Sequence, residues 1–173
     1  TFKYIDGSLH CEGVDLSVLE KKYGTPSYVY SKKTIKENTK AYVNSFTNRR
    51  NLACFAVKSL SNLSILKIIK DAGCGFDIVS GGELHRVLSI GADPKKVIFS
   101  GVGKTKNEIQ QGINNGILSF NVESESELYR IEKIADDIES PAPISIRINP
   151  DIDSGGHDYI TTGRKGDKFG ISD

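Results

Sequence analysis

The chain has 173 residues with 23 basic and 22 acidic side chains, so its formal net charge is only +1. This balance offers no electrostatic basis for binding nucleic acid or an anionic membrane. The sequence has no apolar run of about 18 residues and no apolar signal-peptide core, so it predicts neither a membrane span nor secretion. It contains no methionine, and we therefore expect a trimmed or processed product.

The three cysteines, Cys11, Cys54 and Cys74, lie far apart and form no C-x-x-C pair. This spacing argues against a zinc site or a disulfide framework and fits a reducing compartment. We therefore expect a cytoplasmic protein without a metal site. Cys54 and Cys74 stand in apolar strand contexts, which predicts buried and inert thiols.

The first 26 residues are predicted to form a segment of their own. Short extended stretches flank the turn Asp6-Gly7, and a helix then runs from the cap Asp15 to Gly24. The dipeptide Thr25-Pro26 breaks the chain.

The next two elements are predicted to be a strand and a helix. Residues 27–30 have the composition of a strand. The spacing of Ile35, Tyr42 and Phe46 gives the following helix one apolar face.

From residue 52 onward, strands and helices alternate. Glycines end three of the predicted helices, at Gly73, Gly91 and Gly116. Residues 150–173 are polar and rich in glycine, which is typical of a long loop. The predicted strands are 52–57, 75–79, 97–99, 117–122 and 143–148.

Three helices begin with the same S/T-x-x-E pattern, the capping box. The three boxes are Ser80 to Glu83, Thr105 to Glu108 and Ser124 to Glu127, and each follows a strand directly. Short strand-to-helix loops of this kind predict βα units and a parallel sheet. Such a sheet is either open and doubly wound or part of a (β/α)₈ barrel, which needs about 250 residues when complete.

Lys58 follows the apolar run 52–57, which lacks polar alternation and is predicted to be buried on both faces. A lysine there either extends its amine into water or enters a pocket. At the C-terminal mouth of a parallel barrel, a partly desolvated amine would act as a nucleophile toward carbonyl groups.

Asp77 and Arg147 are also charged residues within apolar strands. A buried carboxylate needs a cation or a hydrogen-bond donor beside it. Lys58, Asp77 and Arg147 come from three strands and lie near the C-terminal end of each, so we expect a polar cluster at one mouth of a barrel. Glu83 has a simpler role as the carboxylate of a capping box.

Other polar residues are weaker candidates for a functional site. The run 101–105 resembles a phosphate loop, but Ile98 stands where that motif needs glycine, so we expect Lys104 to be solvated near a helix start. Gly81-Gly82 is interpreted as a tight turn rather than a phosphate site. His85 is predicted to be exposed, whereas His157, in the terminal loop, could contact a ligand or be solvated.

Taken in order along the chain, these residues resemble the PLP-dependent decarboxylases of the alanine-racemase-like barrel type, and within them the diaminopimelate decarboxylases. The resemblance covers nearly the whole chain, and its most specific piece is 157–163. One departure is Ser59-Leu60, where the family has Ala-Asn after the lysine. The matching segments are 13–16, 23–26, 55–58, 61–63, 75–84, 98–105, 121–124, 147–151, 157–163 and 168–171.

The resemblance implies decarboxylation of meso-2,6-diaminopimelate to L-lysine in lysine biosynthesis, with pyridoxal 5'-phosphate as cofactor. Lys58 would carry the cofactor, Asp77 would tune the charge state of Lys58, and Arg147 would face the cofactor. Glu83 and His157 would play supporting roles. No metal, nucleic acid or membrane is implied; the partners are an amino-acid substrate and, in the full-length enzyme, a second copy.

The same resemblance implies an α/β fold that is a partial (β/α)₈ TIM-type barrel of about the first five strands. Residues 27–173 would be the N-terminal portion of that barrel. Residues 1–26 would pair with a C-terminal β-domain that this sequence lacks, and the fragment alone would be inactive. Two alternatives stay open: a related decarboxylase acting on arginine, ornithine or carboxynorspermidine, and a non-catalytic decarboxylase-like subunit.

Overall fold

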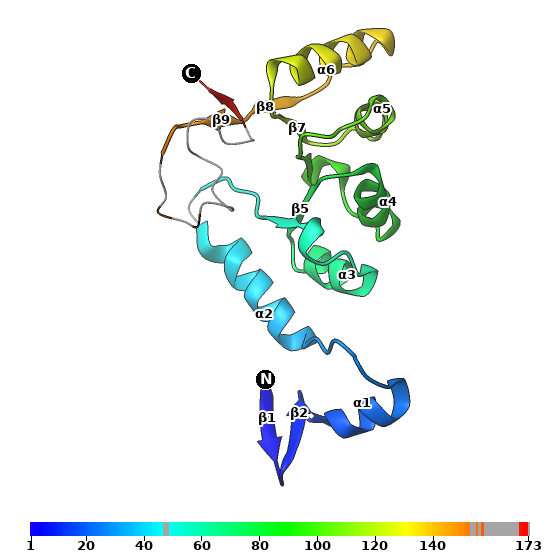
Figure 1. Ribbon diagram of the computed structural model, residues 1–173, viewed down its shortest axis with the longest axis vertical. Helices are drawn as coiled ribbons and strands as arrows, with labels where there is room; N and C mark the ends of the chain where they lie inside the picture. The colour runs from blue at the N-terminus through cyan, green and yellow to red at the C-terminus, as the bar shows by residue number, and fades with distance from the viewer. Residues whose placement is uncertain (47–48, 153–154, 156, 158–169, 173) are drawn as a thin grey trace.

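The computed structural model describes residues 1–46, 49–152, 155, 157 and 170–172. An N-terminal region of short strands and two helices leads into a parallel sheet covered by helices (Figure 1). Over the described residues, no helix is both long enough and apolar enough to cross a bilayer.

The N-terminal region begins with a β-hairpin. Strands β1 (Phe2–Ile5) and β2 (Ser8–Cys11) are antiparallel, and β2 also pairs with β3 (Val14–Asp15). The predicted turn is confirmed, since Asp6 and Gly7 both have positive φ, at 48° and 81°, as a tight two-residue hairpin turn requires.

The predicted helix of this region, α1 (Leu16–Tyr23), is also confirmed. The Asp15 carboxylate accepts a hydrogen bond from the Ser17 N–H at 2.9 Å. Gly24, with φ of 78°, follows the last turn and ends the helix.

The strand predicted at residues 27–30 is wrong. These residues have no strand assignment, and Tyr28 is 91% exposed. A strand needs a hydrogen-bonded neighbour, and none of the described strands pairs with this stretch.

Helix α2 (Lys32–Val43) continues into a short 3₁₀ turn, η1 (Asn44–Phe46). Its apolar face is only partly used. Ile35 packs against the core, as does Val43, whereas Tyr42 and Phe46 are exposed. Helix α2 contacts α3 (Leu63–Asp71) (Figure 1).

The central sheet has five parallel strands in sequential order, and four helices lie on one side of it (Figure 1). Sequential order with helices on one side is the arrangement of a (β/α)₈ barrel, whereas a doubly wound sheet has helices on both faces. The predicted α/β partial barrel is therefore confirmed. The strands are β4 (Cys54–Ala56), β5 (Gly75–Ile78), β6 (Val97–Phe99), β7 (Ser119–Val122) and β8 (Ile144–Ile146); the helices are α3, α4 (Gly81–Ser89), α5 (Lys106–Asn115) and α6 (Glu125–Asp137).

Four shorter elements complete the fold: η2 (Val57–Ser59), η3 (Pro94–Lys96), β9 (Ile148–Asn149) and β10 (Ile171–Ser172). Strand β10 pairs in parallel with β9. The predicted terminal loop is therefore wrong at residues 171–172, which find a partner more than 20 positions earlier. Most of that predicted loop lies outside the described residues.

The three capping boxes differ in completeness. Thr105 and Glu108 form the full reciprocal box, as predicted. Ser80 and Ser124 each accept the expected N–H of the glutamate three residues later. Those glutamates, however, reach one residue further back, because Glu83 accepts from the Val79 N–H and Glu127 from the Glu123 N–H, both at 2.7 Å.

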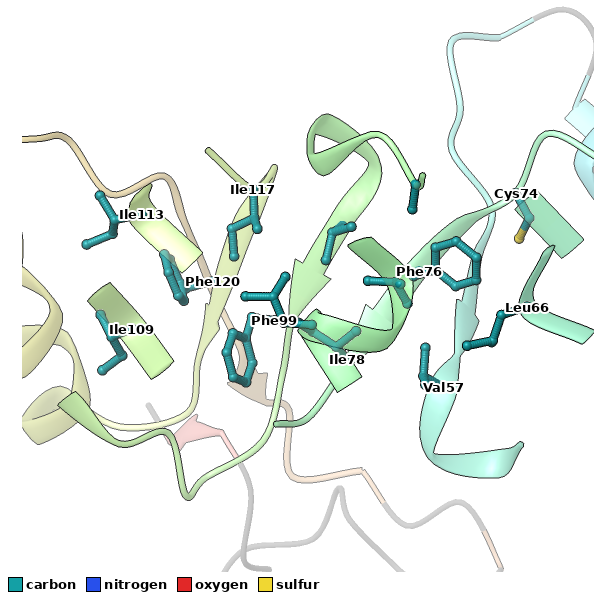
Figure 2. Packing of buried hydrophobic residues seen from close by; sticks show 14 of the residues in the cluster. Val57, Leu66, Cys74, Phe76, Ile78, Phe99, Ile109, Ile113, Ile117 and Phe120 are labelled. Atoms are coloured by element: carbon teal, nitrogen blue, oxygen red, sulfur yellow. The ribbon is translucent and has the colours of Figure 1, made fainter. Parts of the chain in front are cut away.

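The core lies between the sheet and its helices (Figure 2). Phe99 and Phe120 stack with ring centroids 6.0 Å apart. Helix α5 approaches this layer at Gly112, where a β-carbon would lie 2.6 Å from Phe120 Cζ. The side chains with 1% exposure or less include Val57, Leu66, Phe76, Ile78, Val87, Val97, Phe99, Ile109, Ile117, Phe120, Val122 and Ile131.

Strand β4 is less buried than predicted. Its three residues are half-buried, because β4 is an edge strand of the five-stranded sheet and the face opposite the helices has no covering layer in the part of the chain described. Cys54 accordingly is half-buried, whereas Cys74 is buried as predicted. Burial is still enough to raise the pKa of the Cys54 thiol to about 11, with Cys74 and Asp77 adding to the effect. The prediction of a buried thiol is wrong for Cys54, and its inertness stays a prediction.

Candidate active site

The uncovered face of the sheet is polar at the C-terminal ends of its strands. Side chains alternate between the two faces of a strand. Phe76 and Ile78 are buried on the helix side, so Asp77 between them projects to the opposite face. We call the set of polar residues at the C-terminal ends of β4 to β8 the rim.

Lys58 lies in η2, directly after β4. Two hydrogen bonds stabilise this turn, from the Leu60 N–H to the Val57 carbonyl at 3.0 Å and from Ser59 Oγ to the Ala56 carbonyl at 2.7 Å. Val57 is fully buried beside Lys58. The Lys58 side chain is exposed, and within the described residues its amine forms no ion pair.

Asp77 is paired in register with Ala56 on the adjacent strand. Its carboxylate accepts a hydrogen bond from Ser100 Oγ at 2.5 Å, and Ser100 Oγ accepts from Asn121 Nδ2 at 2.8 Å. The donor that the sequence required for Asp77 is therefore Ser100. This network joins β5, the end of β6 and β7. Sequence reasoning missed Ser100 and Asn121, although both are polar residues at strand ends.

Arg147 lies between β8 and β9. Its Nη1 bonds both oxygens of Glu123, at 3.3 and 3.1 Å. Glu123 follows β7 and has a side chain only 2% exposed, against 40% for Arg147. Sequence reasoning also missed Glu123, whose signal is a carboxylate directly after a buried strand.

The prediction that Lys104 is solvated is wrong. Its side chain is completely buried. The Nζ donates to the carbonyls of Gly101 at 2.7 Å and Asn121 at 2.8 Å, and to Glu127 Oε1 at 2.9 Å. These three acceptors match the three donors of an ammonium group, so the lysine is accommodated by contacts that its local sequence does not reveal.

Glu83 and the glycine pair have structural contacts. The Glu83 carboxylate accepts a hydrogen bond from the Val79 N–H and so stabilises the end of β5. The Gly81 N–H donates to Glu108 Oε1 at 2.7 Å, and a β-carbon on Gly81 would lie 2.9 Å from Glu108 Cγ. A neighbouring carboxylate thus occupies the position where a phosphate would bind, which confirms the interpretation as a tight turn.

The two histidines that the sequence analysis considered are both exposed, His85 as predicted. The segment 157–163 lies outside the described residues apart from His157. Lys58 and Asp77 lie at the ends of adjacent strands, whereas Arg147 is at the opposite edge of the five-stranded sheet.

Residues 32–173 match the family described as pyridoxal-dependent decarboxylase, pyridoxal binding domain. The chain belongs to this family. It is 48% identical to the diaminopimelate decarboxylases of Pseudomonas aeruginosa and Haemophilus influenzae over 99% of its length, which is 41% of each relative. The chain thus spans about two fifths of the length of the curated relatives it matches.

Solved structures of family members have the same fold. Diaminopimelate decarboxylase from Helicobacter pylori, complexed with L-lysine, superposes with a TM-score of 0.88 at 44% identity, over 91% of this chain and 40% of that one. The enzyme from M. jannaschii, also in complex with L-lysine, gives 0.88 at 36% identity over 99% and 41%.

The cofactor of this family is pyridoxal phosphate, and the rim residues fit it. The cofactor carries an aldehyde, with which a lysine amine can condense. Lys58 offers such an amine on a hydrogen-bonded turn, without an ion-pair partner in the part of the chain described. The carboxylate of Asp77 and the guanidinium of Arg147 supply charges of both signs on the same rim.

Proposed function

We propose that the complete protein decarboxylates meso-2,6-diaminopimelate to L-lysine and that this chain supplies the N-terminal part of the cofactor site. The observation that carries the proposal is the placement of Lys58 at the C-terminal end of β4, next to the strand that bears Asp77. Active sites of (β/α)₈ enzymes lie at this end of the barrel. The similarity to named diaminopimelate decarboxylases supports the substrate.

In this proposal Lys58 holds pyridoxal phosphate, and Asp77 and Arg147 orient it. When bound, the cofactor supplies an electron sink for the charge left on the substrate as CO₂ departs. Lys58 Nζ is then placed to move a proton to or from the substrate. Asp77 is held by Ser100 and Arg147 by Glu123, so both charges have fixed positions at the rim.

Glu83 and His157 take supporting roles. Glu83 bonds the Val79 backbone and so fixes the end of the strand that carries Asp77. His157 is exposed beyond β9 and belongs to segment 157–163, the most specific piece of the resemblance to diaminopimelate decarboxylases. We propose that the complete enzyme is a homodimer, which light scattering would test.

An assay of CO₂ release by the complete protein tests the function. We expect release from meso-2,6-diaminopimelate and little from arginine, ornithine or carboxynorspermidine. Release from one of the other three amino acids alone would replace the proposed substrate and keep the cofactor chemistry.

A lysine-auxotroph complementation test separates the enzyme from a non-catalytic subunit. The parent gene should restore growth without lysine, whereas Lys58→Ala should not. Growth with the variant equal to that with the parent would support the non-catalytic alternative.

A further inference from the structure

Four charged side chains form a connected path from the core to the rim. Lys104 pairs with Glu127 at 2.9 Å, and Arg147 pairs with Glu123 at 3.1 Å. The backbone joins the two pairs, because Glu127 Oε2 accepts from the Glu123 N–H at 2.7 Å. The side chains of Lys104, Glu127 and Glu123 are 5% exposed or less, and of the four only Arg147 reaches the surface.

The buried part of this path closes into a ring. The Gly101 carbonyl accepts from Lys104, and the Gly101 N–H donates to Glu123 Oε1 at 3.2 Å. Glu127 then links Glu123 back to Lys104 through its two oxygens. Each carboxylate therefore bonds to backbone as well as to a cation, which fixes the direction of the Glu123 oxygens that hold Arg147.

Stability alone does not account for such an arrangement. A buried ion pair gains little over well-packed apolar side chains of similar volume, since the desolvation cost offsets the attraction. Lys104 and Glu127 lie at the end of a sheet whose buried residues are mostly apolar, with Ser119 and Glu123 among the exceptions. A fixed geometry at the rim is a benefit that apolar residues could not provide.

We propose that Lys104 and Glu127 are a positioning pair for the cofactor site. They hold Glu123 in the ring, and Glu123 holds the guanidinium of Arg147 toward the cofactor. The inference rests on the proposed function for the role of Arg147. Neither Lys104 nor Glu127 is expected to touch cofactor or substrate.

The test replaces both members of the pair in the complete protein, as Lys104→Met with Glu127→Met. The two charges are removed together, so no unpaired buried charge remains. The Gly101 and Asn121 carbonyls and the Glu123 N–H lose their partners, so we expect a lower unfolding temperature, and cofactor affinity is measured at a temperature where the variant is folded. We expect the dissociation constant for pyridoxal phosphate to rise about tenfold and kcat/KM to fall about tenfold or more, since small misplacements of a binding group have effects of this size. The matched control is Lys106→Met with Asp137→Met, a surface pair at 3.3 Å, which should change neither value.

A double-mutant cycle with Arg147→Ala locates the effect. If the pair acts through Arg147, its replacement in the Arg147→Ala background should leave the cofactor dissociation constant unchanged within about twofold. Full additivity would contradict the inference.

A folded double variant with parental cofactor affinity and kcat/KM would also overturn it. Should that variant fail to fold, Glu127→Gln serves instead, because an amide has only one acceptor oxygen and cannot accept from both Lys104 Nζ and the Glu123 N–H; parental affinity there would likewise overturn the inference. If the parent protein releases no CO₂ from diaminopimelate, the proposed function fails, and cofactor affinity still tests the positioning pair.

Discussion

We propose that the two faces of the five-stranded sheet divide stability from chemistry. On the helix side, Phe76, Phe99 and Phe120 are almost completely buried in a continuous apolar layer (Figure 2). On the opposite side, Asp77 and Asn121 join a polar network at the strand ends. Neighbouring residues in one strand therefore serve different purposes, and a substitution on one face should leave the property of the other face largely intact.

The largest effect is expected for Lys58→Ala on the polar side. Decarboxylation by the complete protein should fall by about 10³-fold or more, since the amine proposed to hold the cofactor is lost. The unfolding temperature should stay near the parental value, because the side chain is exposed. Steady-state kinetics measures the first and thermal unfolding the second. The control is Lys67→Ala, an exposed lysine on α3; equal losses in both variants would contradict the division.

The next effect belongs to the helix side. Phe120→Ala should lower the free energy of unfolding by about 3–5 kcal/mol, because it removes a buried ring and leaves a cavity. Tyr129→Ala removes an exposed ring from α6 and should cost less than about 0.5 kcal/mol. Urea denaturation measures both, and similar costs for the two rings would show that the apolar layer is not the source of stability.

A smaller effect tests how closely α5 packs on the sheet. Gly112→Ala should destabilise by about 1–3 kcal/mol, since its β-carbon would overlap Phe120. Alanine otherwise favours helices by about 1 kcal/mol over glycine. Gly82→Ala in α4 meets only Ser80 Oγ, at 3.8 Å, and should be neutral or stabilising. The reverse order of unfolding temperatures would contradict the packing described.

The smallest effect returns to the polar side. Ser100→Ala removes the donor to Asp77, and kcat/KM of the complete protein should fall about tenfold, the loss of about 1.4 kcal/mol of binding energy to the transition state. Ser89→Ala, which loses only a bond to the Arg86 carbonyl on the surface of α4, is the control. An equal fall of kcat/KM in Ser89→Ala would show that the hydrogen bonds among Asp77, Ser100 and Asn121 have no specific effect on catalysis.

The sequence predicted the βα units well because their signals are local. Strand runs, the caps at Ser80, Thr105 and Ser124 and the final glycines all act within a few residues. It could not predict the partners of Lys104 and Arg147, since their carboxylates lie 23 and 24 positions away and become neighbours only in the folded sheet. The wrong strand at 27–30 has a related cause, because strand formation depends on a neighbouring strand that local composition does not reveal.

The roles assigned to the rim residues depend on Lys58 as the residue that binds the cofactor. Reduction of the complete protein with borohydride in the presence of pyridoxal phosphate, followed by peptide mass spectrometry, tests this directly. We predict a pyridoxyl group on the peptide that contains Lys58 and its absence from the Lys58→Ala protein. Labelling of a different lysine in the parent, with Lys58 unmodified, would contradict the account.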